Sequence, residues 1–327
     1  MLHIILHVVI SITGVWNAWG YNSGNWAELA PVLSRNGYDT VFYCAVYGLE
    51  TDIAGLNECI VACNDYDIDV HAWIVMWKIG KSSEQKKALL ADQERLQVSA
   101  DDDIRAQSWL CPTDPANVAE MAAVCLAVAA YNNIRGIHLD YIRYSSNRVC
   151  FCEGCRRRFQ HDSGIYGISW PDDCASGGRL YTEYNRWRSE AITSAVSTIR
   201  DSLGRLNKIV ELSAAVLPRE REMDYYAQHW DRWLSSGLVD FVIPMNYTIS
   251  DSELVSWGES QLHLAGRSSI PCGLITYQND YQLTQSEIEN QQRMAVEMGF
   301  DGWVMFHLSN HLFSQLDENE TRRVLHR

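Results

Sequence analysis

Eight short apolar runs, rich in β-branched and aromatic residues, alternate with helical patterns from one end of the chain to the other. This alternation is typical of parallel βα units, in which a helix returns the chain to the start of the next strand. The expected strands cover residues 13–19, 40–47, 70–77, 136–141, 209–217, 241–247, 270–277 and 302–308. Eight consecutive units predict an α/β fold of the closed (β/α)8 TIM barrel type.

Glycines at the boundaries between these units support the same fold. Gly37, Gly237 and Gly299 each stand just before an expected strand, where a helix C-cap requires left-handed backbone. A barrel commonly takes up a chain of this length as one unit, so residues 1–327 are expected to form a single domain. Two insertions interrupt the rhythm, at about residues 80–112 after the third strand and 145–179 after the fourth. Both follow the C-terminal strand ends, where barrels build their active sites.

Charge and composition restrict the partners. With 27 basic and 41 acidic residues, the formal charge of −14 repels phosphate backbones, so nucleic acid is not expected as a partner and neutral glycans suit the surface better than acidic ones. The 12 Trp and 16 Tyr supply flat faces that stack on sugar rings, although most of them are expected in the core. The sequence does not indicate an oligomeric state.

No apolar run is long enough to span a bilayer, so membrane insertion is not expected. The first residues are apolar, but they lack a basic start and a small-residue cleavage site, and they run directly into the first expected strand. The sequence therefore predicts a soluble protein and slightly favours the cytoplasm over export.

The segment GIHLDYIRY, which begins at Gly136, is the most informative in the chain. A period of two places Ile137 and Leu139 outward and His138 and Asp140 inside the barrel. A carboxylate that is merely buried costs several kcal/mol, so its position at the end of a strand indicates function. Asp140 is predicted to be a catalytic general acid; the alternative is a structural ion pair with Arg143.

The same period-two argument predicts that aromatic and hydrogen-bonding side chains form a cup around Asp140. It turns Trp303, Met305 and His307 inward on the last strand, Met245 and Tyr247 on the sixth, and His71, Trp73 and Trp77 on the third. The alternative for each histidine is a core residue with satisfied hydrogen bonds. The predicted substrate-binding residues are Trp16, Tyr43, Trp73, Trp77, His138, Arg143, Asn246, Tyr247, Tyr277, Trp303 and His307.

Several of these segments together resemble a known family. They are WLCP from Trp109, the GIHLDYIRY segment, CFCEGC from Cys150, the stretch 239–248 and GFDG from Gly299. In this combination the chain resembles the family 10 glycosyl-hydrolase-like barrels, which implies a (β/α)8 fold and glycan hydrolysis. A more distant similarity is to the family 18 chitinases, but Ile142 stands where their catalytic glutamate would fall. The chain therefore cannot use that glutamate.

Glycoside hydrolysis normally requires a second carboxylate beside the general acid. Asp224, in the loop after the fifth strand, is the predicted second group, and Glu50, Glu153 and Asp280 also follow C-terminal strand ends. Glu211 is set aside because it begins a strand. A chain without the second carboxylate would be a carbohydrate-binding pseudoenzyme. No catalytic cofactor is expected, and the absence of an H-x-H pattern ending the first strand disfavours a metal-dependent hydrolase.

The cysteines indicate a metal site. The C-x-C-x-x-C spacing of Cys150, Cys152 and Cys155 lets three thiolates converge on one ion. The resemblance to the family 10 barrels implies that Cys111 is the fourth ligand. The galactosidases of family 42 look similar in pairing three such cysteines with one from an earlier loop. Cys174 is the alternative fourth ligand. Four thiolates imply a structural zinc without an open position for water. Two disulfides among these five cysteines are the competing interpretation.

Overall fold

The computed structural model describes residues 11–18, 25–48, 50–79, 95–101, 108–130, 133–309, 311–312 and 316. The apolar start of the chain, the end of the first expected strand and much of the first insertion lie outside these residues. No helix in the described ranges combines the length and apolar character needed to cross a membrane.

Eight parallel strands form the centre of the molecule. They follow one another around the sheet in the order β7-β6-β5-β4-β2-β1-β11-β8, and a parallel bridge between Met245 and Gly273 joins the two ends. The predicted (β/α)8 barrel is thereby confirmed. The strands are β1 (Ile12–Asn17), β2 (Thr40–Tyr47), β4 (Asp69–Val75), β5 (Gly136–Asp140), β6 (Glu211–Val216), β7 (Phe241–Pro244), β8 (Cys272–Ile275) and β11 (Gly302–Phe306).

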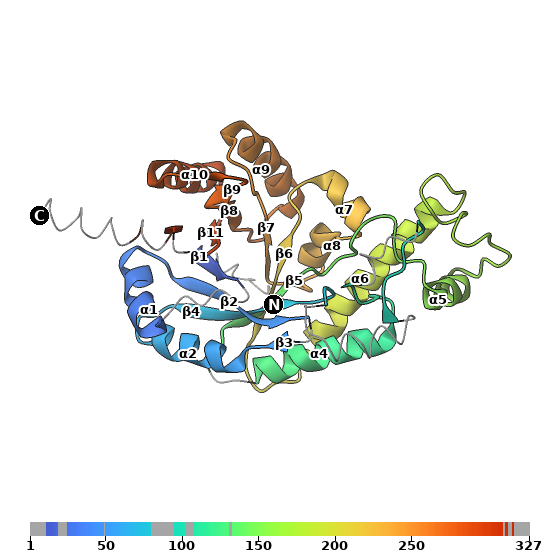
Figure 1. Cartoon of the computed structure of the whole chain (residues 1–327), viewed down its shortest axis with the longest axis horizontal. Coiled ribbons are helices and arrows are strands. Elements are labelled where there is room, and N and C mark those ends of the chain that lie inside the picture. Colours follow the sequence, from blue (N-terminus) through green and yellow to red (C-terminus); the bar gives the residue numbers. More distant parts are fainter. Residues whose placement is uncertain are drawn as a thin grey trace, which may run out of the picture.

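Helices cover the outside of the barrel, with α1, α2, α4 and α6 along one side and α9 and α10 along the other (Figure 1). The expected left-handed residues are present at Gly37, Gly237 and Gly299, whose φ angles are 81°, 68° and 104°. The helices are α1 (Trp26–Arg35), α2 (Ile53–Asn64), α4 (Pro115–Ala129), α5 (Glu153–Ser163), α6 (Tyr181–Leu203), α7 (Glu220–Tyr226), α8 (Trp230–Ser235), α9 (Asp251–Ala265) and α10 (Gln285–Met298).

Apolar side chains fill two layers. One lies between the strands and the helices, and the other fills the barrel itself with Ile12, Trp16, Phe42, Trp73 and Phe241 among its members. Each large side chain that is fully buried contributes roughly 1.5–3 kcal/mol. The interior is therefore a packed core, with a cavity at the C-terminal strand ends.

The two insertions pack against each other at that end. In the first, Leu96 pairs with Leu110 and Lys78 pairs with Trp109. The second contains α5, which stands off to one side of the barrel (Figure 1). Phe151 donates its backbone N–H to the Val98 carbonyl at 2.8 Å, which joins the two insertions. Two short hairpins complete the same end: β3 (Glu50–Thr51) pairs with the end of β2, and β9 (Tyr277–Gln278) pairs with β10 (Tyr281–Gln282).

Candidate active site

Asp140 is the last residue of β5, and its side chain points into the barrel as predicted. Only 6% of the residue is exposed. One carboxylate oxygen accepts the indole N–H of Trp73 at 3.2 Å, and the other accepts the backbone N–H of Tyr141 at 2.6 Å. Two donors from different segments therefore fix the plane of the carboxyl group.

The backbone turns sharply directly after Asp140. Tyr141 has a φ of 53°, a left-handed conformation that costs a non-glycine residue of order 1–3 kcal/mol. This turn aims its N–H back at the carboxylate and keeps its ring at the pocket, where period two alone would have placed it outside the barrel. Such strain often accompanies function.

Asp140 opens onto a cavity of about 250 Å³ at the C-terminal end of the barrel. Of the predicted site residues, Trp16, Trp73, Arg143 and Tyr247 line this cavity with it. The remaining lining residues are Ala18, Cys44, Tyr47, Tyr141, Ala215, Met245 and Phe306. Tyr247 and Phe306, whose rings stack on each other with their centres 5.0 Å apart, form an aromatic wall of the cavity.

The cavity changes the acidity of its carboxyl group. Burial raises the pKa of Asp140 from 3.8 to about 6, although the Tyr141 N–H and the positive charge of Arg143 both lower it. Burial also raises the pKa of Tyr247 and, to about 12, that of Tyr141, so both phenols stay protonated as hydrogen-bond donors. The site therefore contains a carboxyl group that can carry a proton near neutrality, with neutral aromatic groups and the cation of Arg143 around it.

His138 lies inside the barrel as predicted, but it does not line the cavity. Its Nε2 accepts the indole N–H of Trp16 at 3.1 Å, and its Nδ1 lies 2.9 Å from the Ser213 hydroxyl. Burial lowers the pKa of His138 far below its usual value, so the ring is neutral. It supports Trp16 from within the core instead of forming part of the cavity wall.

The predicted orientation of β11 is wrong. Val304 packs into the barrel interior, and Phe306 lines the cavity, while Met305 belongs to the layer under the helices. Trp303 also faces that outer layer, where its ring meets Tyr38 edge-on at 5.2 Å. Both faces of this strand are apolar, so its sequence contained no marker of which one faced inward.

Three further residues predicted to bind substrate lie away from the cavity. Tyr43 points outward and donates its hydroxyl to Asp52 at 2.6 Å. Asn246 is fully buried and exchanges hydrogen bonds with the side-chain amide of Gln261. Trp77 is wholly buried in the outer layer, two residues beyond the end of β4.

Tyr277 and His307 lie beyond the cavity wall and not in it. Their rings meet edge-on at 6.0 Å, and His307 also contacts the ring of Phe306, which does line the cavity. Tyr277 is 41% exposed. The two residues can reach only a ligand that extends out of the cavity.

Asp224 does not reach the cavity. It lies in α7 with 75% of its side chain exposed and forms an ion pair with His229 at 3.1 Å. The expected loop is a helix here, and it carries Asp224 away from Asp140. Glu153 also has a structural role: it is the first residue of α5 and forms an ion pair with Arg156 at 3.6 Å.

Sequence reasoning missed two tyrosines of the cavity. Tyr141 adjoins Asp140 in the chain, and proximity to it was the available signal. Tyr47 ends β2 after an irregularity between Cys44 and Val46, which shifts the alternation of inward side chains by one residue. A bulge of this kind breaks the period-two rule and leaves no mark in the sequence.

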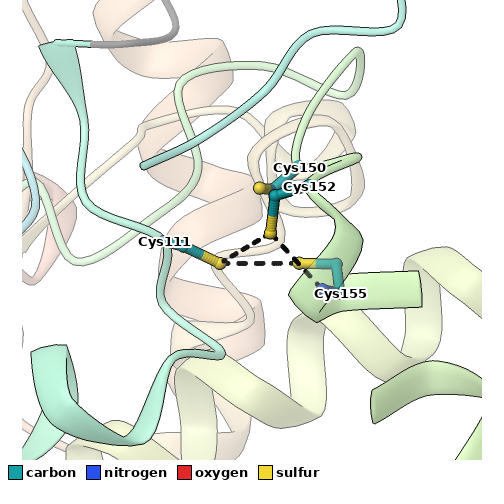
Figure 2. Close-up of side chains that lie close together, drawn as sticks. All are labelled: Cys111, Cys150, Cys152 and Cys155. Carbon is teal, nitrogen blue, oxygen red and sulfur yellow. Dashed lines mark hydrogen bonds between the residues drawn. The ribbon is translucent and has the colours of Figure 1, made fainter. Parts of the chain in front are cut away.

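The four predicted metal-binding cysteines converge at the junction of the two insertions (Figure 2). Their sulfurs all lie within 4.8 Å of one another, with Cys111 3.5 Å from Cys155 and 3.9 Å from Cys152. Backbone N–H groups of Val98 and Cys155 point at the sulfurs of Cys150 and Cys152, at 3.4 and 3.3 Å. Cys174 is not part of this group and packs instead among the aromatic rings beside α5.

A scan of protein-family models finds no match to the chain, and neither does a search of curated proteins. The resemblance to the family 10 glycosyl-hydrolase-like barrels stays a prediction.

Solved structures show where the same fold occurs. The glycoside hydrolase domain of PgaB (BpsB) from Bordetella bronchiseptica superposes with a TM-score of 0.71 at 11% identity, over 91% of each chain. A β-galactosidase from Bacillus circulans sp. alkalophilus gives 0.64 at 14% identity, over 91% of this chain and 50% of that one. A chitinase from Chromobacterium violaceum gives a TM-score of 0.53 at 10% identity, over 94% of this chain and 98% of that one. At these identities the similarity shows a shared barrel fold.

Proposed function

We propose that the protein is a glycoside hydrolase with Asp140 as its general acid. The observation that carries this proposal is a buried carboxyl group with a pKa of about 6, held by two N–H donors at the end of a barrel strand and open to an aromatic cavity. The names of the similar structures support it, because they include a glycoside hydrolase domain, a galactosidase and a chitinase.

In this proposal, protonated Asp140 donates its proton to the glycosidic oxygen as the bond to the leaving sugar breaks. Trp73 and the Tyr141 backbone hold the carboxyl group in one orientation, so no side-chain freedom is lost when substrate enters. The aromatic wall of Tyr247 and Phe306 offers an apolar surface to a sugar ring.

The second carboxylate is assigned to Glu50, in place of Asp224. Glu50 is directly opposite Tyr47 in the β2–β3 hairpin. Residues directly opposite in an antiparallel pair share one face of the sheet, and Tyr47 lines the cavity. Burial raises the pKa of Tyr47, and the negative charges of Asp140 and Glu50 both add to this increase. Glu50 does not line the cavity, but it lies opposite a residue that does, and on this ground we propose it as base or nucleophile.

A carbohydrate-binding protein without catalysis is the second candidate. It is favoured by one observation, namely that Asp140 is the only carboxylate among the described residues that line the cavity. Such a protein would keep the aromatic wall and lose only the second step of the chemistry.

A panel of polysaccharides, incubated with the wild type, Asp140→Asn and Glu50→Gln, separates the two candidates. Hydrolysis predicts new reducing ends with the wild type and a large loss with both variants. Asp224→Asn is the matched control and should retain activity. Binding of a glycan that no enzyme preparation cleaves would favour the non-catalytic candidate, and full activity of Asp140→Asn would contradict the assignment of the acid.

We also propose that Cys111, Cys150, Cys152 and Cys155 hold a structural zinc ion. Four ligands at about 2.3 Å around a tetrahedral ion place their sulfurs roughly 3.8 Å apart. Cys111 lies 3.5 Å from Cys155 and 3.9 Å from Cys152, and all four sulfurs lie within 4.8 Å of one another, which suits that geometry. All four side chains are buried, and the two backbone N–H groups directed at sulfur stabilise thiolate. The ion would tie the two insertions together and would take no part in catalysis.

Metal analysis of protein purified without added zinc tests this proposal. One zinc per chain is expected, with loss of the metal and a lower melting temperature in Cys152→Ser, while the buried Cys125→Ser variant keeps its metal. Mass spectrometry that found these four cysteines oxidised in pairs would overturn it.

A further inference from the structure

Arg143 occupies an unusual position in the candidate active site. It lines the cavity together with Asp140, and its guanidinium group lies among three aromatic rings. The distances to the ring centres are 5.3 Å for Trp109, 5.1 Å for Tyr141 and 4.8 Å for Tyr226. The rings come from three separate segments, so the fold as a whole holds the cation in place.

This guanidinium has no carboxylate partner within 4.0 Å among the residues that the structure describes, and it does not pair with Asp140. One terminal nitrogen donates to the Tyr144 carbonyl at 3.2 Å, while the buried Nε has no hydrogen-bond partner in the described part of the chain. The structural ion pair between Arg143 and Asp140, which was the alternative to a catalytic role, is therefore absent among the described residues. The Nε is not accessible to a ligand, but among the described residues the terminal nitrogens make only the one hydrogen bond to Tyr144, so their other N–H groups are left for a ligand.

A second cation lies close by. The Lys78 amine is 5.3 Å from the centre of the Tyr141 ring, on which Arg143 also packs. Both positive charges are near enough to lower the pKa of Asp140. In a chain with 41 acidic and 27 basic residues, one side of this cavity is thus locally positive.

We propose that the cavity takes a sugar that carries a carboxylate, and that Arg143 is the residue that recognises it. The planar guanidinium fork matches a carboxylate in shape and charge, and aromatic stacking leaves its edge available for two parallel hydrogen bonds. The formal charge of −14 acts on approach from a distance, whereas selection inside the cavity depends on the groups that touch the ligand. The inference rests on the proposed carbohydrate site and names its substrate class.

Paired oligosaccharides test this inference independently of catalysis. Binding is measured in the Asp140→Asn background, which prevents turnover, with uronic-acid oligosaccharides of several linkages and the carboxyl-reduced counterpart of each. At least one acidic oligosaccharide should bind about 10- to 100-fold more tightly than its reduced counterpart, as expected for a hydrogen-bonded charge. The additional change Arg143→Gln should remove this preference, and Arg143→Lys should retain part of it.

Arg186→Gln on the surface of α6 is the matched control and should leave the preference unchanged. Equal binding of every acidic and reduced pair, or a preference that survives Arg143→Gln, would overturn the inference. So would tighter binding of sulfated neutral oligosaccharides than of the carboxylated ones. Cleavage of neutral glycans with no acidic preference would leave the proposed hydrolase intact and remove only this inference.

Discussion

The barrel contains a buried acidic side chain at each end, and the two are held in different ways. At the N-terminal end, Glu211 forms an ion pair with Arg135 and lies 3.7 Å from the ring of His71. Burial lowers the pKa of His71 to about 3, so the ring is neutral and Arg135 is the charged partner. At the C-terminal end, Asp140 receives two N–H groups and no ion pair within the described structure.

This difference separates a structural carboxylate from one available for chemistry. Glu211 has its charge compensated by the protein, so a ligand could gain little from it. Asp140 has its plane fixed but its charge uncompensated by direct contact, and it faces a cavity. Burial alone therefore does not identify the functional group, since both residues are at most 9% exposed.

The largest expected effect is on turnover. Asp140→Asn keeps the shape of the side chain but cannot deliver a proton, and general acid catalysis is typically worth about 10²- to 10⁴-fold. Glu211→Gln, at the opposite end, should leave turnover within roughly twofold, since it touches no part of the catalytic machinery. Steady-state kinetics on a glycan that the wild type cleaves measures the turnover of both variants. Equal losses of turnover would contradict the distinction between a catalytic Asp140 and a structural Glu211.

The next largest effect is a pH-dependent change in stability. Because folding raises the pKa of Asp140 from 3.8 to about 6, its protonated form stabilises the protein fully below about pH 4, and this contribution is lost as the pH rises through 6. The shift corresponds to about 3 kcal/mol. Asp140→Asn, which stays neutral, should therefore gain about that much relative to the wild type between pH 4 and pH 8.

Urea unfolding of both proteins at several pH values measures this difference. A stability difference that does not change with pH would mean that Asp140 keeps an ordinary pKa, and the candidate acid would lose its main support.

A smaller effect is expected at the N-terminal end. Burial raises the pKa of Glu211 despite the charge of Arg135, so Glu211→Gln, which removes only the charge, should not cost stability near pH 7. Glu211→Ala also removes the acceptor of the Arg135 hydrogen bond and should cost about 1–3 kcal/mol of unfolding free energy. Asp69→Ala is the matched control: Asp69 also pairs with Arg135, at 3.6 Å, but its side chain is 59% exposed. An exposed pair contributes about 0–1 kcal/mol, so the control should change little. Equal losses of unfolding free energy in the two variants would show that the exposure of a carboxylate does not determine how much its ion pair with Arg135 contributes.

The smallest effect concerns the tuning of Asp140. The Trp73 N–H lowers the pKa of Asp140, so Trp73→Phe should raise it and move the alkaline fall in activity to higher pH. Arg143, Lys78 and the three neighbouring tyrosines are unchanged in this variant. Trp230→Phe, which removes a buried indole outside the cavity, should leave the pH profile in place. A shift to lower pH would contradict the assigned hydrogen bond.

The sequence by itself determined the barrel and the position of Asp140. Its C-x-C-x-x-C spacing brought three cysteines together, whereas the fourth, Cys111, was expected only from the family resemblance, with Cys174 as the alternative. Strand and helix periods are local properties of the chain, and glycines mark the turns between them, so eight units could be counted directly. In β5 the inward face was marked by polar residues, His138 and Asp140, which identified the parity. The single domain, the zinc and the catalytic roles stay predictions.

Only the tertiary structure decided which aromatic residues surround Asp140. In β11 both faces are apolar, so period two could not show that Phe306, and not Trp303, faces inward. The bulge before Tyr47 and the left-handed turn at Tyr141 changed side-chain directions at the strand ends. Such irregularities are stabilised by contacts with distant segments, as in the Tyr141 ring packed near Trp109, at 5.3 Å. The local sequence determines the periodicity of side-chain directions in each element. Long-range packing determines the residues at which that pattern begins, shifts and ends.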